Sequence, residues 1–401
     1  MSLSRAIQTI LLTALLPAQW LVLRALFPEL SHEWQALSAG LGIFGAAFLL
    51  SWAAETGQVD VPEALALAFL ALIAVLPEYA VDMYFAYRAG SDPAYTSFAT
   101  ANMTGANRLL IGLGWPAVVA AFWLARGGRE IELDRGQTLE LACLAVATVY
   151  AFLLAWKGSI HLLDAAVLLA LFTAYMVAAA RSAHGEVELE GLPQALATQL
   201  GTGGRRGAVA ALLLLSGATI YTAAEPFAEG LLAIGRRFAI EEFVLVQWLA
   251  PLASESPEFI VAIIFAWHGK PNAGMRALVS SKVNQWTLLI GMLPIAYSMG
   301  GGGAGMHLDK RQVEEILLTA AQSLFALVVL ANFRFSLLEA GMLALLFLTQ
   351  LVITDEWART VYAFAYLALA LAWGIARADN RRGLVEIVRL GSTAPGQDRT
   401  P

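Results

Sequence analysis

Two Pro-Glu dipeptides lie in similar apolar windows of the chain. The first window is LPEYAVDMYFAY (76–87) and the second, 180 residues later, is SPEFIVAIIFAW (256–267). Five of the twelve positions are identical, and two more exchange one aromatic residue for another. A carboxylate within a membrane helix is a functional-site hypothesis by default. Glu78 and Glu258 are therefore the first candidate site residues, and the chain looks internally duplicated around them.

Each of these glutamates has a second acid at helical spacing. Asp82 follows Glu78 by four residues and Glu255 precedes Glu258 by three, so each pair can share one helix face. If the two copies pack together, four carboxylates converge, and such oxygens are preferred ligands of sodium and calcium ions. The alternative is that some of these acids have local partners or lie near a helix end. Histidine or cysteine ligation of zinc or copper is not indicated, because Cys143 is the only cysteine and the histidines lack ligand spacing.

A polar helix is expected after each Pro-Glu window. The two sequences are TSFATANMTGANRLLIGLGWP (96–116) and ALVSSKVNQWTLLIGMLP (277–294). Amide and hydroxyl oxygens there could complete the coordination shell of a cation, or could only form hydrogen bonds between helices. The candidates are Asn102, Asn107, Ser281, Asn284 and Gln285.

Two basic residues lie well inside these polar helices. We expect Arg108 and Lys282 to face polar or charged partners inside the helix bundle, because an unmatched charge in hydrocarbon is costly. The alternative is that the ends of the helices are misplaced and both side chains reach the headgroups.

The composition describes a polytopic all-α membrane protein. Hydrophobic residues make up 59% of the chain, charged residues only 14%, and the mean hydropathy is +0.66. Stretches long enough to cross the roughly 30 Å of hydrocarbon number twelve. They are predicted near 5–27, 34–55, 61–88, 95–125, 137–157, 160–181, 207–234, 240–268, 272–300, 312–332, 336–353 and 357–377.

The distribution of basic residues predicts the orientation of the chain. Fifteen Lys and Arg residues fall on the side that holds both termini and seven on the opposite side, so both termini are expected in the cytoplasm, with the protein in a prokaryotic inner (plasma) membrane. The Pro-Glu windows lie on the third and eighth spans, an odd number apart. The second copy therefore runs opposite to the first, which is the inverted topology of many secondary transporters.

The expected organisation is two repeats of five helices with an extra helix at each end. An N-terminal helix lies in 1–33, and a C-terminal helix with a cytoplasmic tail lies in 354–401. The repeats occupy 34–181 and 207–353, joined by a cytoplasmic connection at 182–206. Its EVELEGLPQALATQL segment (186–200) could form a short helix, but a plain linker is favoured.

This arrangement resembles the cation/calcium exchanger superfamily, which includes the sodium/calcium exchangers. In that family each repeat carries a motif like G-[ST]-[SA]-x-P-[ED], whose acidic residue is a central ion ligand; the match falls on Glu78 and Glu258. The second family motif, G-S-N-x-x-[ND], maps in the second repeat onto Ser280, Ser281 and Lys282 and ends at Gln285. In the first repeat its register is open among Asn102, Thr104 and Asn107.

The chain departs from the family pattern at four positions. The family hydroxyl three residues before the glutamate is Val75 in one repeat and Glu255 in the other. Sodium/calcium exchangers place no Arg or Lys in the second helices, where this chain has Arg108 and Lys282. Four acids offset by these two bases leave a formal site charge near −2, which suits one calcium ion or two sodium ions, and a buried acid can also exchange protons.

The resemblance implies a secondary active antiporter that exchanges sodium, calcium and/or protons by alternating access at a midplane carboxylate site. The alternatives are a cation channel and a sodium/proton antiporter without calcium transport. The expected partners are monovalent or divalent cations and the lipid bilayer, with no nucleic acid and no cofactor. An enzyme is not indicated, because no nucleophile with a base and no metal triad occurs in the pattern.

Overall fold

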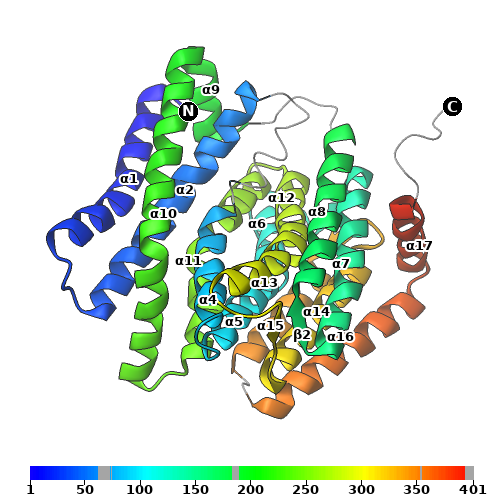
Figure 1. Cartoon of the computed structure of the whole chain (residues 1–401). Helices are drawn as coiled ribbons and strands as arrows, with labels where there is room; N and C mark the ends of the chain where they lie inside the picture. The colour runs from blue at the N-terminus through cyan, green and yellow to red at the C-terminus, as the bar shows by residue number, and fades with distance from the viewer. Residues whose placement is uncertain (62–72, 74, 183–188, 353–354, 393–401) are drawn as a thin grey trace. The chain divides into compact units, whose positions relative to one another are not determined.

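The computed structural model describes residues 1–61, 73, 75–182, 189–352 and 355–392 and shows a helical protein (Figure 1). Its α-helices are α1 (Leu3–Leu26), α2 (His32–Gly57), α4 (Leu76–Ala89), α5 (Tyr95–Leu109), α6 (Trp115–Arg126), α7 (Thr138–Lys157), α8 (Leu162–Ser182), α9 (Gly191–Gln199), α10 (Thr202–Phe238), α11 (Glu242–Trp267), α12 (Pro271–Asn284), α13 (Ile290–Met299), α14 (Lys310–Leu330), α15 (Leu337–Val352), α16 (Glu356–Ala376) and α17 (Ala378–Ser392). The predicted all-α architecture is confirmed.

Short elements connect and interrupt these helices. The 3-10 turns are η1 (Gln58–Asp60) and η3 (Arg135–Gln137), and π-helical turns η2 (Leu110–Gly114) and η4 (Gln285–Leu289) interrupt both predicted polar helices. Two small antiparallel sheets, which were not predicted, pair β1 (Glu130–Glu132) with β4 (Arg334–Ser336) and β2 (Ser159–His161) with β3 (Gly305–His307).

Within the described ranges, nine helices are long and apolar enough to cross a membrane. Three of the twelve predicted spans are not among them. The described part of span 61–88 is mainly α4, since 62–72 and 74 lie outside the described residues. The segment α12–η4–α13 is helical but is not apolar enough to be among the nine, and α15 is apolar but has only 16 residues. The count of twelve therefore stays a prediction.

The described chain divides into two compact units. The first comprises Met1–Phe85 and Ala179–Pro257, and the second comprises Ala86–Ala178 and Glu258–Pro401. Each unit therefore takes helices from both predicted repeats.

In the first unit, α2 packs along α10 and α1 packs along α2. Small residues bring the backbones together, as is usual for helices in lipid. Gly40 of α2 faces the ring of Phe227, Gly42 faces Trp20, and Gly45 faces Leu16. Glycines of α2 thus allow close approach of side chains from both α10 and α1.

The predicted linker between the repeats contains a helix, so the expectation of a plain linker was wrong. Leu192, Ala195 and Leu196 of α9 are buried and pack against Ala6 of α1. Their spacing of three and four residues places them on one helix face. The helix forms because this face has an apolar partner, which the segment alone does not reveal.

In the second unit, α14 is the central helix. Of its apolar window 78% is buried, and it packs against α5, α7, α16 and α17. The C-terminal tail, expected only as a tail, includes α17. Asn380 of α17 donates to the carbonyl oxygen of Val328 (2.7 Å), and Glu386 pairs with Arg135 (2.6 Å).

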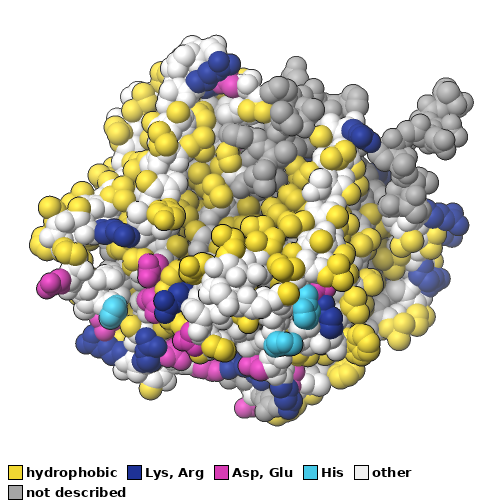
Figure 2. Space-filling view, in the orientation of Figure 1, with side chains coloured by type: hydrophobic (Ala, Val, Ile, Leu, Met, Phe, Trp, Pro, Cys, Tyr) yellow, Lys and Arg dark blue, Asp and Glu magenta, His cyan; other side chains and the backbone are white. Residues whose placement is uncertain are grey.

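The surface of the described chain is largely apolar. Figure 2 shows hydrophobic side chains spread over the visible face. On α1, Leu11, Leu12 and Leu15 are each more than 60% exposed, and Trp156 at the end of α7 is 85% exposed. Apolar surface of this extent is typical of a protein whose helices face lipid.

The contact between α2 and α10 yields a stability prediction. A Cβ atom at Gly230 of α10 would lie 2.3 Å from the Cβ of Ala36 and 2.8 Å from the carbonyl oxygen of His32. Gly230→Ala should therefore lower the melting temperature of the purified protein in detergent, because overpacking costs about 1–3 kcal/mol.

Gly217→Ala is the matched control in the same helix. A Cβ atom there would meet nothing within 4 Å. Because alanine favours a helix over glycine by about 1 kcal/mol, this variant should melt at the same or a higher temperature. Equal melting temperatures for both variants would contradict the packing described here.

Candidate cation-binding site

The first Pro-Glu motif lies at the start of a helix. Helix α4 begins at Leu76, so Pro77 and Glu78 are both in its first turn. Proline suits this position because the first-turn backbone N–H groups have no intrahelical acceptor. The positive end of the helix dipole also favours a carboxylate there. The sequence thus positions Glu78 by local rules alone, and the side chain is buried.

Three of the four predicted acids gather in the first unit. Glu78, Asp82 and Glu255 are all buried, and each interacts electrostatically with the half-buried Tyr79. Tyr84, also on α4, donates a hydrogen bond of 2.7 Å to Glu229 of α10. Helices α4, α10 and α11 therefore place a concentration of acidic and phenolic groups in this unit.

Glu258 is described with the second unit, where it is half-buried on α11. The adjacent Phe259 faces Gly114, and the carbonyl oxygen of Ala262 faces Gly274 of α12. The segment that carries Glu258 is thus packed against the two polar helices. The convergence of Glu258 with the other three acids stays a prediction.

The second Pro-Glu motif differs from the first in its helical context. Pro257 lies in the interior of α11, as does Pro251. Because proline has no N–H group, Pro257 cannot donate to the carbonyl oxygen of Ala253, and that oxygen can accept from another group or bind a cation. The first copy of the motif therefore lies in the first turn of α4. The second copy lies inside α11 and interrupts the backbone hydrogen bonds of that helix.

No three His, Cys, Asp or Glu side chains in the described ranges form a group that could hold a metal ion. A cation bound here would need amide, hydroxyl or backbone oxygens as well as carboxylates. The polar helices offer them: Asn102, Asn107, Asn284 and Gln285 are buried, and Ser281 is half-buried. Among the described residues, neither amide atom of Asn102 has a hydrogen-bond partner.

Lys282 joins the two polar helices. Its Nζ atom donates to the Oδ1 atom of Asn107 (2.7 Å) and to the backbone oxygen of Asn107 (3.2 Å). The same Nζ atom lies 4.3 Å from the centre of the Trp286 ring. The expectation that Lys282 faces polar groups inside the protein is confirmed.

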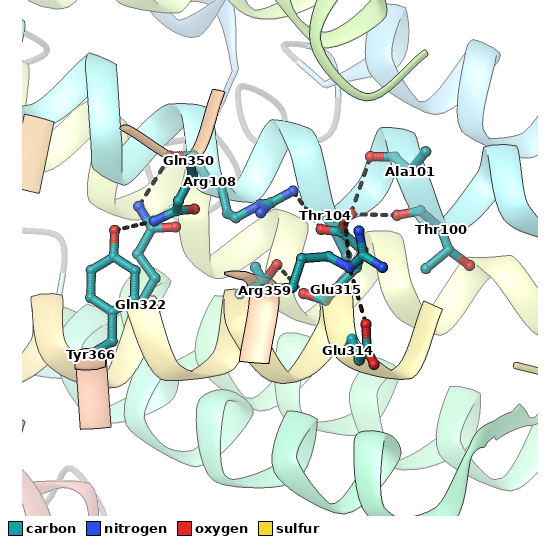
Figure 3. Close-up of polar contacts among 11 residues, drawn as sticks. Thr100, Ala101, Thr104, Arg108, Glu314, Glu315, Gln322, Gln350, Arg359 and Tyr366 are labelled. Carbon is teal, nitrogen blue, oxygen red and sulfur yellow. Dashed lines mark hydrogen bonds and ion pairs between the residues drawn. The ribbon is translucent and has the colours of Figure 1, made fainter. Parts of the chain in front are cut away.

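Arg108 is also buried, and it pairs with an acid that the sequence analysis missed. Its Nη2 atom lies 2.6 Å from the Oε2 atom of Glu315 on α14 (Figure 3). Arg359 of α16 lies 3.1 Å from Glu314 and 4.0 Å from Glu315. Both glutamates lie inside the predicted tenth span, so the rule that intramembrane acids are candidate sites could have found them.

The Arg108–Glu315 ion pair adds an acid that the expected site charge did not include. The formal charge near −2 counted Arg108 against the four predicted acids only, and it stays a prediction.

Comparison with known proteins relates this arrangement to ion exchangers. The sequence model of the family described as sodium/calcium exchanger protein matches residues 34–181 and 208–354. These ranges include both Pro-Glu motifs and both polar helices. No curated protein matches the chain.

Three solved structures resemble the chain over most of its length. The crystal structure of the H+/Ca2+ exchanger CAX is 46% identical, with 96% of this chain and 98% of that chain covered and a TM-score of 0.92. Native YfkE is 13% identical, with coverages of 91% and 100% and a TM-score of 0.63. The sodium-calcium exchanger NCX_Mj is 15% identical, with coverages of 80% and 96% and a TM-score of 0.53.

The latter two similarities show the shared fold alone. The family match extends over both repeats, and the similarity to CAX extends over nearly the whole chain. The chain therefore belongs to the sodium/calcium exchanger family of membrane proteins.

Proposed function

We propose that the protein is a secondary active antiporter that exchanges calcium ions for protons by alternating access. The observation that carries the proposal is the 46% identity, over 96% of the chain, to an H+/Ca2+ exchanger. The alternatives are exchange of calcium for sodium, exchange of sodium for protons, and a cation channel.

The proposed chemistry is competition for carboxylate oxygens. An ionised carboxylate binds calcium strongly, because calcium prefers oxygen ligands that carry negative charge. A protonated carboxyl group is neutral and binds calcium poorly, so proton binding releases the metal ion. The proposed groups are the buried Glu78, Asp82 and Glu255 of the first unit and Glu258 on α11.

The departures from the exchanger pattern favour protons over sodium as the counter-ion. Where the family has a hydroxyl ligand, this chain has the buried Val75 in one repeat and the buried Glu255 in the other. Val75 removes a neutral oxygen that a sodium ion could use. Glu255 adds a group that can take up a proton. Because Arg108 forms an ion pair with Glu315, its charge is already offset by an acid outside the proposed four.

Alternating access follows from the cost of empty carboxylates in the membrane. Ionised carboxylates without a bound cation have a high free-energy cost when they are moved away from water. The change between the inward-facing and outward-facing states therefore requires bound calcium or protons. Helices α2 and α10 are proposed to move as one element, because glycines hold them in close contact.

The ion couple can be tested in sealed proteoliposomes. An imposed proton gradient should drive calcium uptake against its concentration gradient, whereas an imposed sodium gradient should not. Calcium-45 accumulation measures both. Uptake driven only by sodium would replace this proposal with sodium/calcium exchange, and uptake that follows only the calcium gradient would indicate a channel.

The role of the carboxylates gives a second prediction. Glu78→Gln and Glu258→Gln should each reduce proton-driven calcium uptake by about tenfold or more, which corresponds to about 1.4 kcal/mol or more per substitution. Glu29→Gln is the matched control, because Glu29 is exposed between α1 and α2. Full uptake by either site variant, at equal amounts of folded protein, would refute its assignment.

The Arg108–Glu315 pair gives a third prediction. Arg108→Met and Glu315→Leu should each destabilise the protein by about 3–5 kcal/mol, because each leaves one buried charge unmatched. The double variant removes both charges and should recover most of the stability and of the proton-driven uptake. Measured melting temperatures and calcium uptake form a double-mutant cycle. If the double variant folds like the parent but transports no calcium, the pair belongs to the transport site.

A further inference from the structure

The surroundings of Lys282 resemble a binding site for a small cation. The side chain has no exposed surface, and its Nζ atom is held by two oxygens of Asn107 at 2.7 and 3.2 Å. Both oxygens can only accept, so the nitrogen donates to each. The face of the Trp286 ring, 4.3 Å away, adds the negative side of an aromatic quadrupole, which attracts a cation.

Both polar helices are shaped to present these groups. The Nδ2 atom of Asn107 donates to the carbonyl oxygen of Met103 (2.8 Å), which orients the Oδ1 atom of the same amide towards Lys282. Asn107 precedes the π-turn η2 by three residues, and Trp286 lies inside the π-turn η4. Such turns are rare and are frequent at functional sites. Each helix thus departs from regular geometry close to the ammonium group.

We infer that Lys282 is a tethered cation that occupies a monovalent-cation site and thereby excludes sodium from the transport cycle. Two oxygens and an aromatic face are ligands that a sodium, potassium or small organic ammonium ion would accept. With the ammonium group in place, a second cation is kept out by volume and by charge repulsion. The inference rests on the proposed calcium/proton exchange. It names Lys282 as the residue that makes protons, and not sodium, the counter-ion.

Exclusion of sodium leaves protons as the ions that can compete with calcium. A proton adds directly to a carboxylate oxygen and needs no cage of neutral oxygens.

The test is to remove the ammonium group and offer a free cation in its place. Lys282→Ala should bind the cation that Lys282 replaces, so sodium, potassium or methylammonium chloride should raise its melting temperature relative to choline chloride at equal ionic strength. The same ions should restore part of its lost proton-driven calcium uptake. The parent protein should show neither effect.

Two variants control for unrelated causes. Lys282→Met removes the charge but fills most of the space, so added cations should not raise its melting temperature. Lys310→Ala removes a lysine whose side chain is 77% exposed and should behave like the parent. A melting temperature of Lys282→Ala that is the same in all four salts would overturn the inference.

A further test uses only the parent protein, so it does not depend on whether the Lys282 variants fold. Proteoliposomes with an imposed proton gradient and no calcium should take up sodium-22 no faster than empty vesicles. Sodium uptake above that background would overturn the inference. The parent could exchange calcium for protons while added cations change neither the melting temperature nor the uptake of Lys282→Ala. That result would refute this inference and leave the proposed function intact. A parent without calcium/proton exchange refutes the proposed function itself.

Discussion

Every charge inside the membrane helices must be matched, because hydrocarbon offers neither water nor counter-ions. This constraint accounts for the least regular features of the structure. Arg108 is matched by Glu315 across α5 and α14, and Lys282 is matched by the oxygens of Asn107 and the ring of Trp286. The buried acids Glu78, Asp82 and Glu255 fall under the same constraint. In the proposed function, calcium ions and protons contribute to neutralising them, so the constraint that shapes the fold would also drive exchange.

The sequence was sufficient to predict the all-α architecture and most of the long apolar helices. Apolar length predicted nine of the spans that the described residues show, and duplication singled out Glu78 and Glu258 as candidate site residues. Glu315 was missed because an acid inside an apolar helix signals only that a partner exists, not where in the fold that partner lies. The contact between Arg108 and Glu315 joins residues 207 positions apart. Such a pairing depends on tertiary packing, which no local pattern contains.

The elements that were missed share a physical reason. Helices α9 and α17 and the four short strands lie between the predicted spans or at their ends, where length and hydropathy give a weak signal. Each is stabilised by a distant partner, as Leu192 is by Ala6, Asn380 by the carbonyl oxygen of Val328, and β1 by β4. The segment α12–η4–α13 was predicted as a span from its apolar length, but it is not among the nine described helices that are long and apolar enough to cross a membrane.

The lysine between the polar helices also makes the two repeats unequal. Alignment of the LLIG motifs at 109–112 and 288–291 pairs Met103 with Lys282 and Asn107 with Trp286, so the ammonium group contacts both members of one equivalent pair. A transporter with identical inverted halves would have inward-facing and outward-facing states of equal free energy. A lysine in one half, opposite a methionine in the other, removes that equality. If the chain works by the proposed alternating access, this difference would favour one facing state of the ion-free protein over the other, and Lys282 would contribute to which side is open.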